Sequence, residues 1–397
     1  MYSLERLLNH LHLPYPHRRP TGLEALAMNY VISRVGSGML AMFGVLFVFE
    51  LGESFMKGLS LVVIFFGLQR VVVGLVVPVV AELISRIGYR WMMFIGLISL
   101  ALKAFILMQV TLVNMWLLGP ALVLGGIAIA SYYLGYHGIF LNDNDDARIG
   151  EQVGLVTMAG RLALMISPVL AGWLIDSYSF AVMFGVAMSL LIISLAPLFL
   201  MPHHERKSQK FSFKGAVRLL KKKRGFARPV FWWHIQNGFQ AFFWPIFLFL
   251  VVGSHMSFGV IVSLVMMVNS LAVYGTGKLY DKRRLRRAYP VIGGLVALSF
   301  GLRFMTTTPV LVGMMDGFHR LLSPFWWMKI RRNALVAGEK VKAMVFAASW
   351  EWAVTLGYLV AFGVGWLVLW LSEGQWLWLT LPAAIAVGMA SKGVRRK

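Results

Sequence analysis

Cysteine is absent from the 397-residue chain and acidic residues are scarce: 16 Asp and Glu stand against 38 Lys and Arg, for a net charge of +22. Without a thiol, the chain can hold no disulfide framework, thiolate metal site, iron–sulfur cluster or cysteine nucleophile. Charged residues amount to only 14% and hydrophobic residues to 59%, whereas soluble domains carry about 25% charged residues. The composition therefore excludes an ordinary soluble protein, and with it the nucleic-acid partner that so basic a chain would otherwise indicate.

Motifs of catalysis and of ATP use are also missing. The chain has no P-loop, no Gly-x-Ser-x-Gly and no His-Glu-x-x-His. The acidic run at 142–146 is short and is typical of a solvated turn rather than a metal site. We therefore expect neither an enzyme nor an ATP-driven pump, and neither a cofactor nor a bound metal.

Long hydrophobic runs are what the sequence has instead. A spanning helix needs about 20 mainly apolar residues, whereas a membrane β-barrel would show short alternating segments. The stretch 1–24 lacks the compact apolar core and cleavage site of a signal peptide. The sequence predicts an all-α integral membrane protein with twelve transmembrane helices, near residues 25–49, 56–81, 91–111, 115–138, 153–175, 179–201, 230–252, 256–277, 289–306, 309–328, 343–371 and 375–391.

The longest polar stretch, 202–229, separates six of these runs from six. It contains ten Lys or Arg, and the apolar residues between 211 and 220 predict a short amphipathic helix on the membrane surface. The expected domains are a cytoplasmic segment 1–24, a six-helix bundle 25–202, a basic cytoplasmic linker 203–229, a second six-helix bundle 230–391 and a basic cytoplasmic tail 392–397.

The distribution of Lys and Arg predicts the orientation, because these residues are retained on the cytoplasmic side. Of the 38 cations, 31 fall in the two termini and in alternate loops, and one, Lys57, falls in the loops of the other side. We therefore expect a multi-pass protein of the cell (inner) membrane with both termini in the cytoplasm. Most of the basic charge reflects topology.

Two loops in equivalent positions of the two halves carry similar sequences, Ala81–Arg90 and Gly277–Arg283. They resemble the loop between spans two and three of the major facilitator superfamily, written G-x-L-x-D-R-x-G-R-R/K. In that family the loop acts as a conformational latch on the cytoplasmic face. Ser85 stands where the family has its Asp, which weakens the latch in the first half. The resemblance assigns the latch to Leu83, Arg86, Gly88, Arg90, Gly277, Asp281 and Arg283.

The resemblance covers nearly the whole chain and implies two pseudo-symmetric six-helix bundles around a central cavity. In that fold spans 1, 4, 7 and 10 line the cavity, spans 2, 5, 8 and 11 flank it, and spans 3, 6, 9 and 12 lie outside. Span five carries Ser167–Gly172, a worn form of the antiporter pattern G-P-x-x-G-G, which we interpret as a Pro kink with a small residue for close packing. Span four lacks the Arg usual in proton-coupled drug exporters, and this counts against that class.

Six cations fall inside the runs, against two acids. A charge at the bilayer centre costs about 3 kcal/mol or more, so each needs a partner, a cavity or a route to the interface. The excess of cations favours an anionic or zwitterionic solute. Lys103 and Arg303 fall on presumed outer spans. Arg303 lies near the end of its span, so its side chain is expected to extend to the outer membrane–water interface. The substrate-binding candidates are Arg34, Arg70, Arg161 and Arg320, with interhelical ion pairs as the alternative role.

Asp316 and Glu351 are the two deep acids, and either could carry a coupling proton. Asp316 lies four residues before Arg320 on one helix face, so an intrahelical ion pair is the alternative role of Asp316. Arg161 or Arg320 could equally neutralise Glu351 for structural reasons.

Four side chains of span seven follow i, i+4, i+7, i+11 spacing and share one face. They alternate rings with amides, which suits a ligand with apolar and polar parts, although aromatic stripes at this spacing are also common in packing. These further substrate-binding candidates are Trp233, Asn237, Gln240 and Trp244.

The function expected is a secondary transporter that moves a small solute by rocker-switch alternating access. Its expected partners are a small-molecule substrate, a co-transported proton or other ion, and membrane lipids, and the protein is expected to be monomeric. Two alternatives remain open. One is a proton-coupled drug or metabolite exporter, and the other is a non-transporting membrane scaffold or receptor whose basic linker recruits anionic lipid or a partner.

Overall fold

The computed structural model describes residues 22–142, 149–200, 211–222, 224–279, 283–305, 308–338 and 341–394. Within these ranges every regular element is a helix. A chain that spans a bilayer must satisfy its own backbone N–H and C=O groups, and a helix does so within one segment. In chain order the elements are α2 (Gly22–Glu50), α3 (Phe55–Ile87), α4 (Tyr89–Gln109), η1 (Met115–Leu117), α5 (Leu118–Asn142), α6 (Ile149–Ser177), α7 (Phe180–Ile193), α8 (Ala196–Leu200), α9 (Phe213–Lys222), α10 (Arg224–Gly238), η2 (Phe239–Phe243), α11 (Trp244–Val252), α12 (His255–Leu279), α13 (Arg283–Arg303), α14 (Pro309–Gly338), α15 (Ala343–Leu371), η3 (Trp376–Leu379) and α16 (Thr380–Val394).

Nine segments of the described chain are long and apolar enough to cross a membrane. They coincide with predicted runs one to eight and eleven. The other three predicted runs are occupied by α13, α14 and α16, which are helical but carry less continuous apolar sequence. The all-helical membrane fold is therefore confirmed, and the count of twelve spans stays a prediction.

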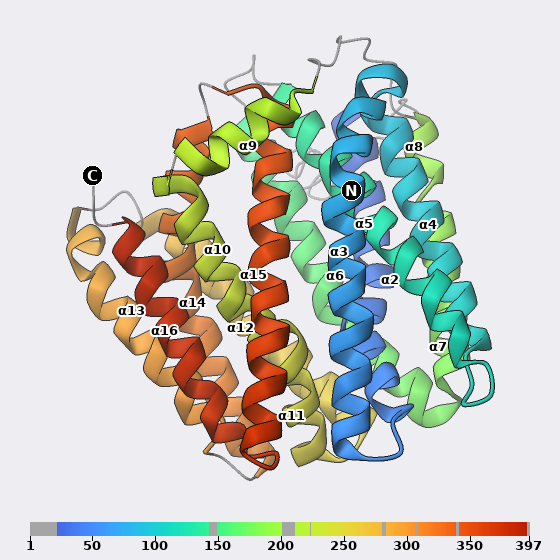
Figure 1. The fold of residues 1–397 in the computed structure, drawn as a ribbon. Coiled ribbons are helices and arrows are strands. Elements are labelled where there is room, and N and C mark those ends of the chain that lie inside the picture. Colours follow the sequence, from blue (N-terminus) through green and yellow to red (C-terminus); the bar gives the residue numbers. More distant parts are fainter. Residues whose placement is uncertain are drawn as a thin grey trace, which may run out of the picture.

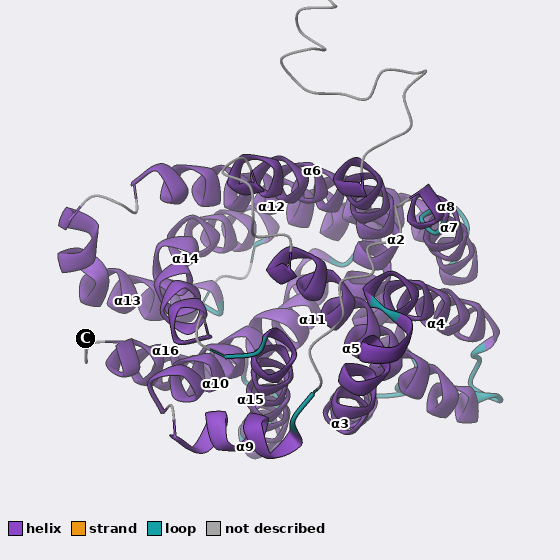
Figure 2. Ribbon diagram, turned by 90° about the horizontal axis from the view of Figure 1, so that it is seen from above, coloured by secondary structure: helices purple, strands orange, loops and turns teal. Residues whose placement is uncertain are grey.

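The helices form two groups, α2–α8 and α10–α16, which meet along two seams (Figure 2). α6 packs against α12 at one seam, and α3 packs against α15 at the other. Two indole groups of α15 hold the second seam. The Nε1–H of Trp352 donates to the carbonyl oxygen of Gly74, and that of Trp366 donates to Ser60 Oγ, each over 2.9 Å.

At the first seam, small residues bring the backbones of α6 and α12 into direct contact. A Cβ atom at Gly172 would lie 2.3 Å from the carbonyl oxygen of His255, and one at Gly259 would lie 2.3 Å from that of Pro168. Neither gap admits a carbon atom, so both positions require glycine. This supports the interpretation of residues 167–172 as a site of close helix packing.

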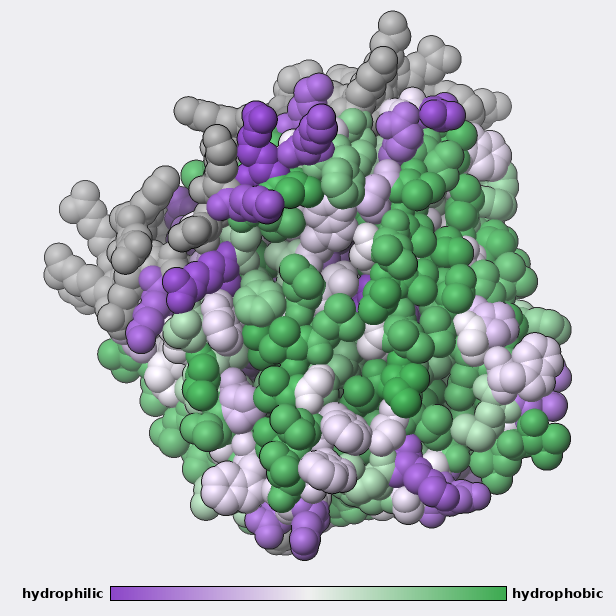
Figure 3. Space-filling view, in the orientation of Figure 1, coloured by the Kyte–Doolittle hydropathy of each residue, from purple (hydrophilic) through white to green (hydrophobic). Residues whose placement is uncertain are grey.

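Apolar side chains cover the outside of the bundle. In Figure 3, hydrophobic residues fill the middle of the visible face and hydrophilic ones gather toward its upper and lower edges. On α3, Ile64, Leu75 and Val79 are more than half exposed. A large continuous apolar surface of this kind fits the hydrocarbon of a bilayer rather than water.

The predicted helix in the basic linker is present as α9, at the upper end of the bundle in Figure 1. Ala216 and Leu219 are buried, and Ser349 Oγ of α15 donates to the carbonyl oxygen of Ala216 over 3.2 Å. The ring of Phe213 meets that of Trp352, with centroids 5.3 Å apart. The apolar face of α9 thus rests on the second half. Contact of this helix with a membrane surface stays a prediction.

The seventh predicted span is interrupted by a turn of π-helix. α10 passes into the π turn η2 at Phe239, and the N–H of Trp244 bonds to the carbonyl oxygen of Phe239 five residues earlier. Pro245 explains this change in hydrogen bonding. Proline has no backbone N–H, so it cannot donate to the carbonyl oxygen four residues earlier as a regular α-helix requires. Such turns are frequent at functional sites, and this one lies where the two halves face each other.

Candidate functional site

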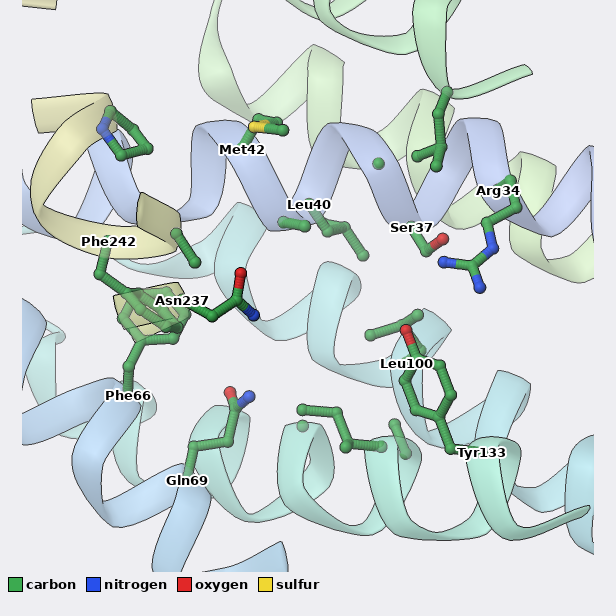
Figure 4. A pocket seen from close by; sticks show the side chains of 18 of the residues that line it. Arg34, Ser37, Leu40, Met42, Phe66, Gln69, Leu100, Tyr133, Asn237 and Phe242 are labelled. Carbon is green, nitrogen blue, oxygen red and sulfur yellow. The ribbon is translucent and has the colours of Figure 1, made fainter. Parts of the chain in front are cut away.

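A cavity of about 370 Å³ lies between the two groups of helices, lined from α2 to α6 on one side and from α10 to α15 on the other. Figure 4 shows its polar end, where Arg34 lies with Ser37 and Tyr133, and an aromatic end with Phe66 and Phe242. The space therefore offers a place for an anionic group and a place for an apolar part of a ligand.

Cations dominate the charge of this cavity. Among the described residues that line it there are four cations and no carboxylate. In a narrow space with low-dielectric walls, charges of one sign raise the local concentration of the opposite ion. The four are Arg34, Arg70, Lys103 and Arg320.

Aromatic rings, rather than an acid, hold Arg34. Its guanidinium carbon lies 4.5 Å from the ring centroid of Tyr30 and 5.8 Å from that of Tyr133. In the part of the chain that the structure describes, no carboxylate lies within 4 Å of it, and its buried Nε has no hydrogen-bond partner. Tyr133 also hydrogen-bonds the guanidinium, but ring faces themselves stabilise a cation without occupying its N–H groups. Arg34 is thus placed to bind an anion.

Arg70 of α3 lies over the ring of Tyr358, at 4.1 Å from its centroid. The hydroxyl of Tyr358 accepts a hydrogen bond from Asn237 Nδ2 over 2.6 Å, which joins α10 to α15. Glu351 of α15 is 7% exposed and is not among the described lining residues. It interacts electrostatically with Arg70. Arg70 thus connects the cavity to a buried carboxyl group.

Lys103 is a cavity residue, which corrects the expectation that the third span lies outside the site. Its Nζ donates to Gln69 Oε1 over 2.8 Å and lies 5.2 and 5.6 Å from the ring centroids of Phe65 and Phe66. The signal was present in the sequence, because a lysine in mid-span without a nearby acid needs a cavity. The assignment of the third span to the outside of the bundle placed Lys103 away from the cavity.

Asp316 lies between two arginines. Its Oδ1 accepts from Arg303 Nη1 over 2.5 Å, and its Oδ2 accepts from Arg320 Nε over 3.2 Å. The intrahelical pair of Asp316 and Arg320 is therefore present. The expectation that Arg303 reaches the interface is wrong, because its side chain is fully buried and stacks against Trp244 and Phe300. Asp316 does not line the cavity, and it positions Arg320, which does.

Three of the four residues of the polar stripe predicted on span seven reach the cavity. Asn237, Gln240 and Trp244 line the cavity, and both amide atoms of Gln240 and the Nε1 of Trp244 are buried without a hydrogen-bond partner within the described chain. Trp233 instead stacks on Trp327, with ring centroids 5.7 Å apart and planes at 4°. The unpartnered polar atoms are available to a ligand.

Arg161 of α6 is not among the described residues that line the cavity. It interacts electrostatically with Tyr30 and Arg34 of α2 and with Arg331 of α14, so it contributes to the positive potential at the polar end. Direct contact with substrate stays a prediction.

The first copy of the latch motif forms the connection between α3 and α4. Gly88 has a φ of 85°, a conformation that favours glycine, and it ends α3 and begins α4. Arg86 pairs with Glu82 one turn earlier at 3.5 Å, and the guanidinium of Arg90 lies 5.6 Å from the ring centroid of Phe199. The motif therefore shapes this turn, whereas its action as a latch stays a prediction.

The rest of the motif can be placed only in part. Leu83 is 37% exposed on α3. Gly277 lies in the last turn of α12, and Arg283 begins α13. Asp281 lies outside the described residues, so the role assigned to it is untested.

A two-part helical bundle with an apolar outer surface and a cation-lined cavity between its halves is typical of membrane transport proteins. A sequence model of the Major Facilitator Superfamily matches residues 26–330, and the chain belongs to this family. A crystal structure of a POT family transporter in complex with 5-aminolevulinic acid has the same fold, with a TM-score of 0.69 and 12% sequence identity over 93% of this chain and 94% of that chain. No curated protein matches the sequence.

Proposed function

We propose that the protein is a secondary transporter of a small anionic or zwitterionic solute, which works by rocking the half before residue 202 against the half after residue 230. One observation carries the proposal: the cavity is lined by four cations and, in the described chain, by no carboxylate. A buried cation costs about 3 kcal/mol or more unless it is compensated. An anionic solute supplies that compensation, whereas a cationic drug would add to the repulsion.

The structural neighbour supports the same class. Its crystal structure contains 5-aminolevulinic acid, so a small acid can be held by this fold. Here the polar end of the cavity, with Arg34 and Tyr133, suits a carboxylate or another anionic group. The unpartnered amide of Gln240 suits a second polar group of the solute.

The test is a thermal-shift screen of purified protein against matched anionic, zwitterionic and cationic solutes, followed by uptake into proteoliposomes. Arg34→Gln and Arg70→Gln should each weaken binding of the solute by about 10- to 100-fold, the effect of losing a charged hydrogen bond. Lys57→Gln is the matched control, because Lys57 is exposed and pairs with Glu53 outside the cavity. Preferential transport of a cation, or full activity of both arginine variants, would contradict the proposal.

Coupling to a proton is the second part of the proposal, and the structure favours Glu351 over Asp316 for it. Asp316 is already bound by two arginines. Glu351 interacts electrostatically with Arg70, which lines the cavity, so a solute at Arg70 would compete with that carboxylate. Glu351→Gln should abolish accumulation driven by a pH gradient while facilitated exchange of the solute persists. Transport that does not depend on any ion gradient would contradict coupling and would indicate a facilitator.

The orientation in the membrane is also a proposal. The distribution of Lys and Arg supports cytoplasmic termini, and α2 begins and α16 ends at the end of the bundle that carries α9 (Figure 1). Accessibility of a terminal tag to protease in right-side-out and inside-out vesicles tests it. Digestion from the outer side of intact cells would reverse the assignment.

A further inference from the structure

At the end of the bundle opposite α9, one histidine joins the two halves. His255 begins α12 in the second half. Its Nε2 lies 2.9 Å from Oε1 of Glu50, which ends α2, and its Nδ1 lies 2.9 Å from Oδ1 of Asp176 near the end of α6. Both carboxylates belong to the first half. The three side chains, named here the outer triad, therefore form an ionic connection across the α6–α12 seam.

Asp176 is further bound to the first turn of α12. Its Oδ2 accepts from the backbone N–H of Met256 over 2.9 Å and from Ser254 Oγ over 3.1 Å. A carboxylate from one half thus caps a helix of the other, which satisfies N–H groups that would otherwise be left to water. The close approach of Gly172 to the His255 carbonyl occurs at the same place. Separation of the halves here breaks all of these contacts together.

Aromatic rings connect the outer triad to the cavity. The ring of His255 lies 4.8 Å from that of Phe249 and 6.3 Å from that of Phe43. Phe43 meets Phe258 edge-on at 5.4 Å, and Phe258 lines the cavity. Phe43 and Phe258 are fully buried. The triad therefore closes the cavity behind a layer of packed rings.

The hydrogen bonds of His255 require a particular protonation state. Both ring nitrogens face carboxylate oxygens, and only the imidazolium form has an N–H on each nitrogen. Neutral imidazole donates to one carboxylate and leaves its other nitrogen, an acceptor, against the second. Among the described residues, Glu50 on α2 and Asp176 on α6 are the charged groups that contact this ring, and the phenyl rings of Phe43, Phe180 and Phe249 lie on its other sides.

We propose that the outer triad is a proton-binding site that controls the outer opening of the cavity. With the imidazolium present, both carboxylates of the first half are held and the outer end stays closed. When the ring proton passes to water at the outer surface, one carboxylate loses its donor and the halves separate more readily. The site lies outside the cavity, so the inference holds whatever solute the cavity carries, and it rests on the proposed rocking of the two halves and on the proposed orientation.

The absence of native cysteine makes the test direct. Spin labels on Val113→Cys and Met305→Cys report the distance between the halves at this end, because Val113 follows α4, Met305 follows α13, and both are exposed. The distance distribution is measured by pulsed electron paramagnetic resonance in lipid nanodiscs, between about pH 5.5 and pH 8.5, which brackets the ordinary histidine value of about 6.5. The population with the longer distance should at least double as the pH rises.

Three variants and a control variant separate this mechanism from a general effect of pH. His255→Gln should remove the pH response, and His255→Lys should keep the closed population high across the whole range because its charge persists. His234→Gln is the matched control, since His234 is a buried histidine bonded to the carbonyl oxygen of Val230, and it should respond like the parent. Asp176→Asn should raise the open population at every pH. A parent protein whose distances do not change with pH, or a His255→Gln variant that keeps the response, would overturn the proposal.

Discussion

Lys103 donates to the side-chain oxygen of Gln69 over 2.8 Å, so a neutral amide and not a carboxylate holds this buried cation. The amide satisfies one N–H of the ammonium group without neutralising its charge. Both residues line the cavity. The positive charge of Lys103 is therefore available to an anion that enters.

Substitution of Lys103 separates ligand binding from folding. Lys103→Met should weaken binding of the anionic solute by about 10- to 100-fold, because a hydrogen bond to a charged group contributes about 1.5–3 kcal/mol. The melting temperature should be retained or rise, because the change removes a buried charge. Binding is measured by calorimetry in detergent with Lys57→Met as the control. An unchanged affinity for the solute would show that Lys103 has a structural role.

Asp316 should be needed for stability. Asp316→Asn removes the carboxylate that both Arg303 and Arg320 contact, and breaking a buried pair in this way costs about 3–5 kcal/mol. Thermal unfolding should occur at a clearly lower temperature, and adding Arg303→Met to the same chain should recover part of the loss. Glu82→Gln removes a carboxylate from an exposed pair and should change stability by about 0.5 kcal/mol or less. Equal melting temperatures for Asp316→Asn and Glu82→Gln would contradict the assignment.

The α6–α12 contact should be intolerant of a single methyl group. Gly172→Ala places a Cβ 2.3 Å from the His255 carbonyl oxygen, whereas Gly44→Ala on α2 meets nothing within 4 Å. The first change should destabilise the protein by about 1–3 kcal/mol, and the second should be neutral or slightly stabilising. Thermal unfolding of the two variants side by side measures the difference. Similar stability would mean that the backbones separate at this crossing without cost.

Two residues of the predicted stripe on span seven should differ in what they do. Asn237 lines the cavity and bonds to Tyr358, whereas Trp233 stacks on Trp327 away from it. Asn237→Ala should reduce affinity for the solute, and Trp233→Leu should lower the melting temperature with affinity retained. Measuring both quantities on each variant tests the division. A large loss of affinity for the solute in Trp233→Leu would show that Trp233 contributes to binding after all.

The fold followed from the sequence because the decisive signals are local. Runs of about 20 apolar residues predict where membrane-spanning helices form. The basic stretch at 202–229 predicts where the two halves divide, although α10 already begins within it at Arg224. Arg34, Arg70 and Arg320 were likewise recognisable, because an arginine in mid-span needs a partner or a cavity wherever the helix packs. These predictions needed no knowledge of which helix neighbours which.

The features that the sequence did not reveal depend on contacts between distant residues. Placement by span number put Lys103 outside the cavity, although α4 turns this side chain inward to Gln69. Regular 3.6-residue spacing put Trp233 in the stripe, but Trp233 lies one turn before Asn237 and stacks on Trp327 of α14 instead of lining the cavity. Glu50, Asp176 and His255 each stand one residue outside a different predicted run, and nothing local in the sequence relates them. Only the crossing of α6 and α12 brings them together.

A space bounded by four cations does not remain free of anions in salt solution, since fixed charge of one sign concentrates mobile ions of the other. Chloride or phosphate from the buffer will occupy it before any organic solute arrives. Entry of the solute is then an exchange of one anion for another, and the measured affinity includes the release of the first. Apparent dissociation constants should rise with chloride concentration and be lowest in buffers whose anions are too large to enter.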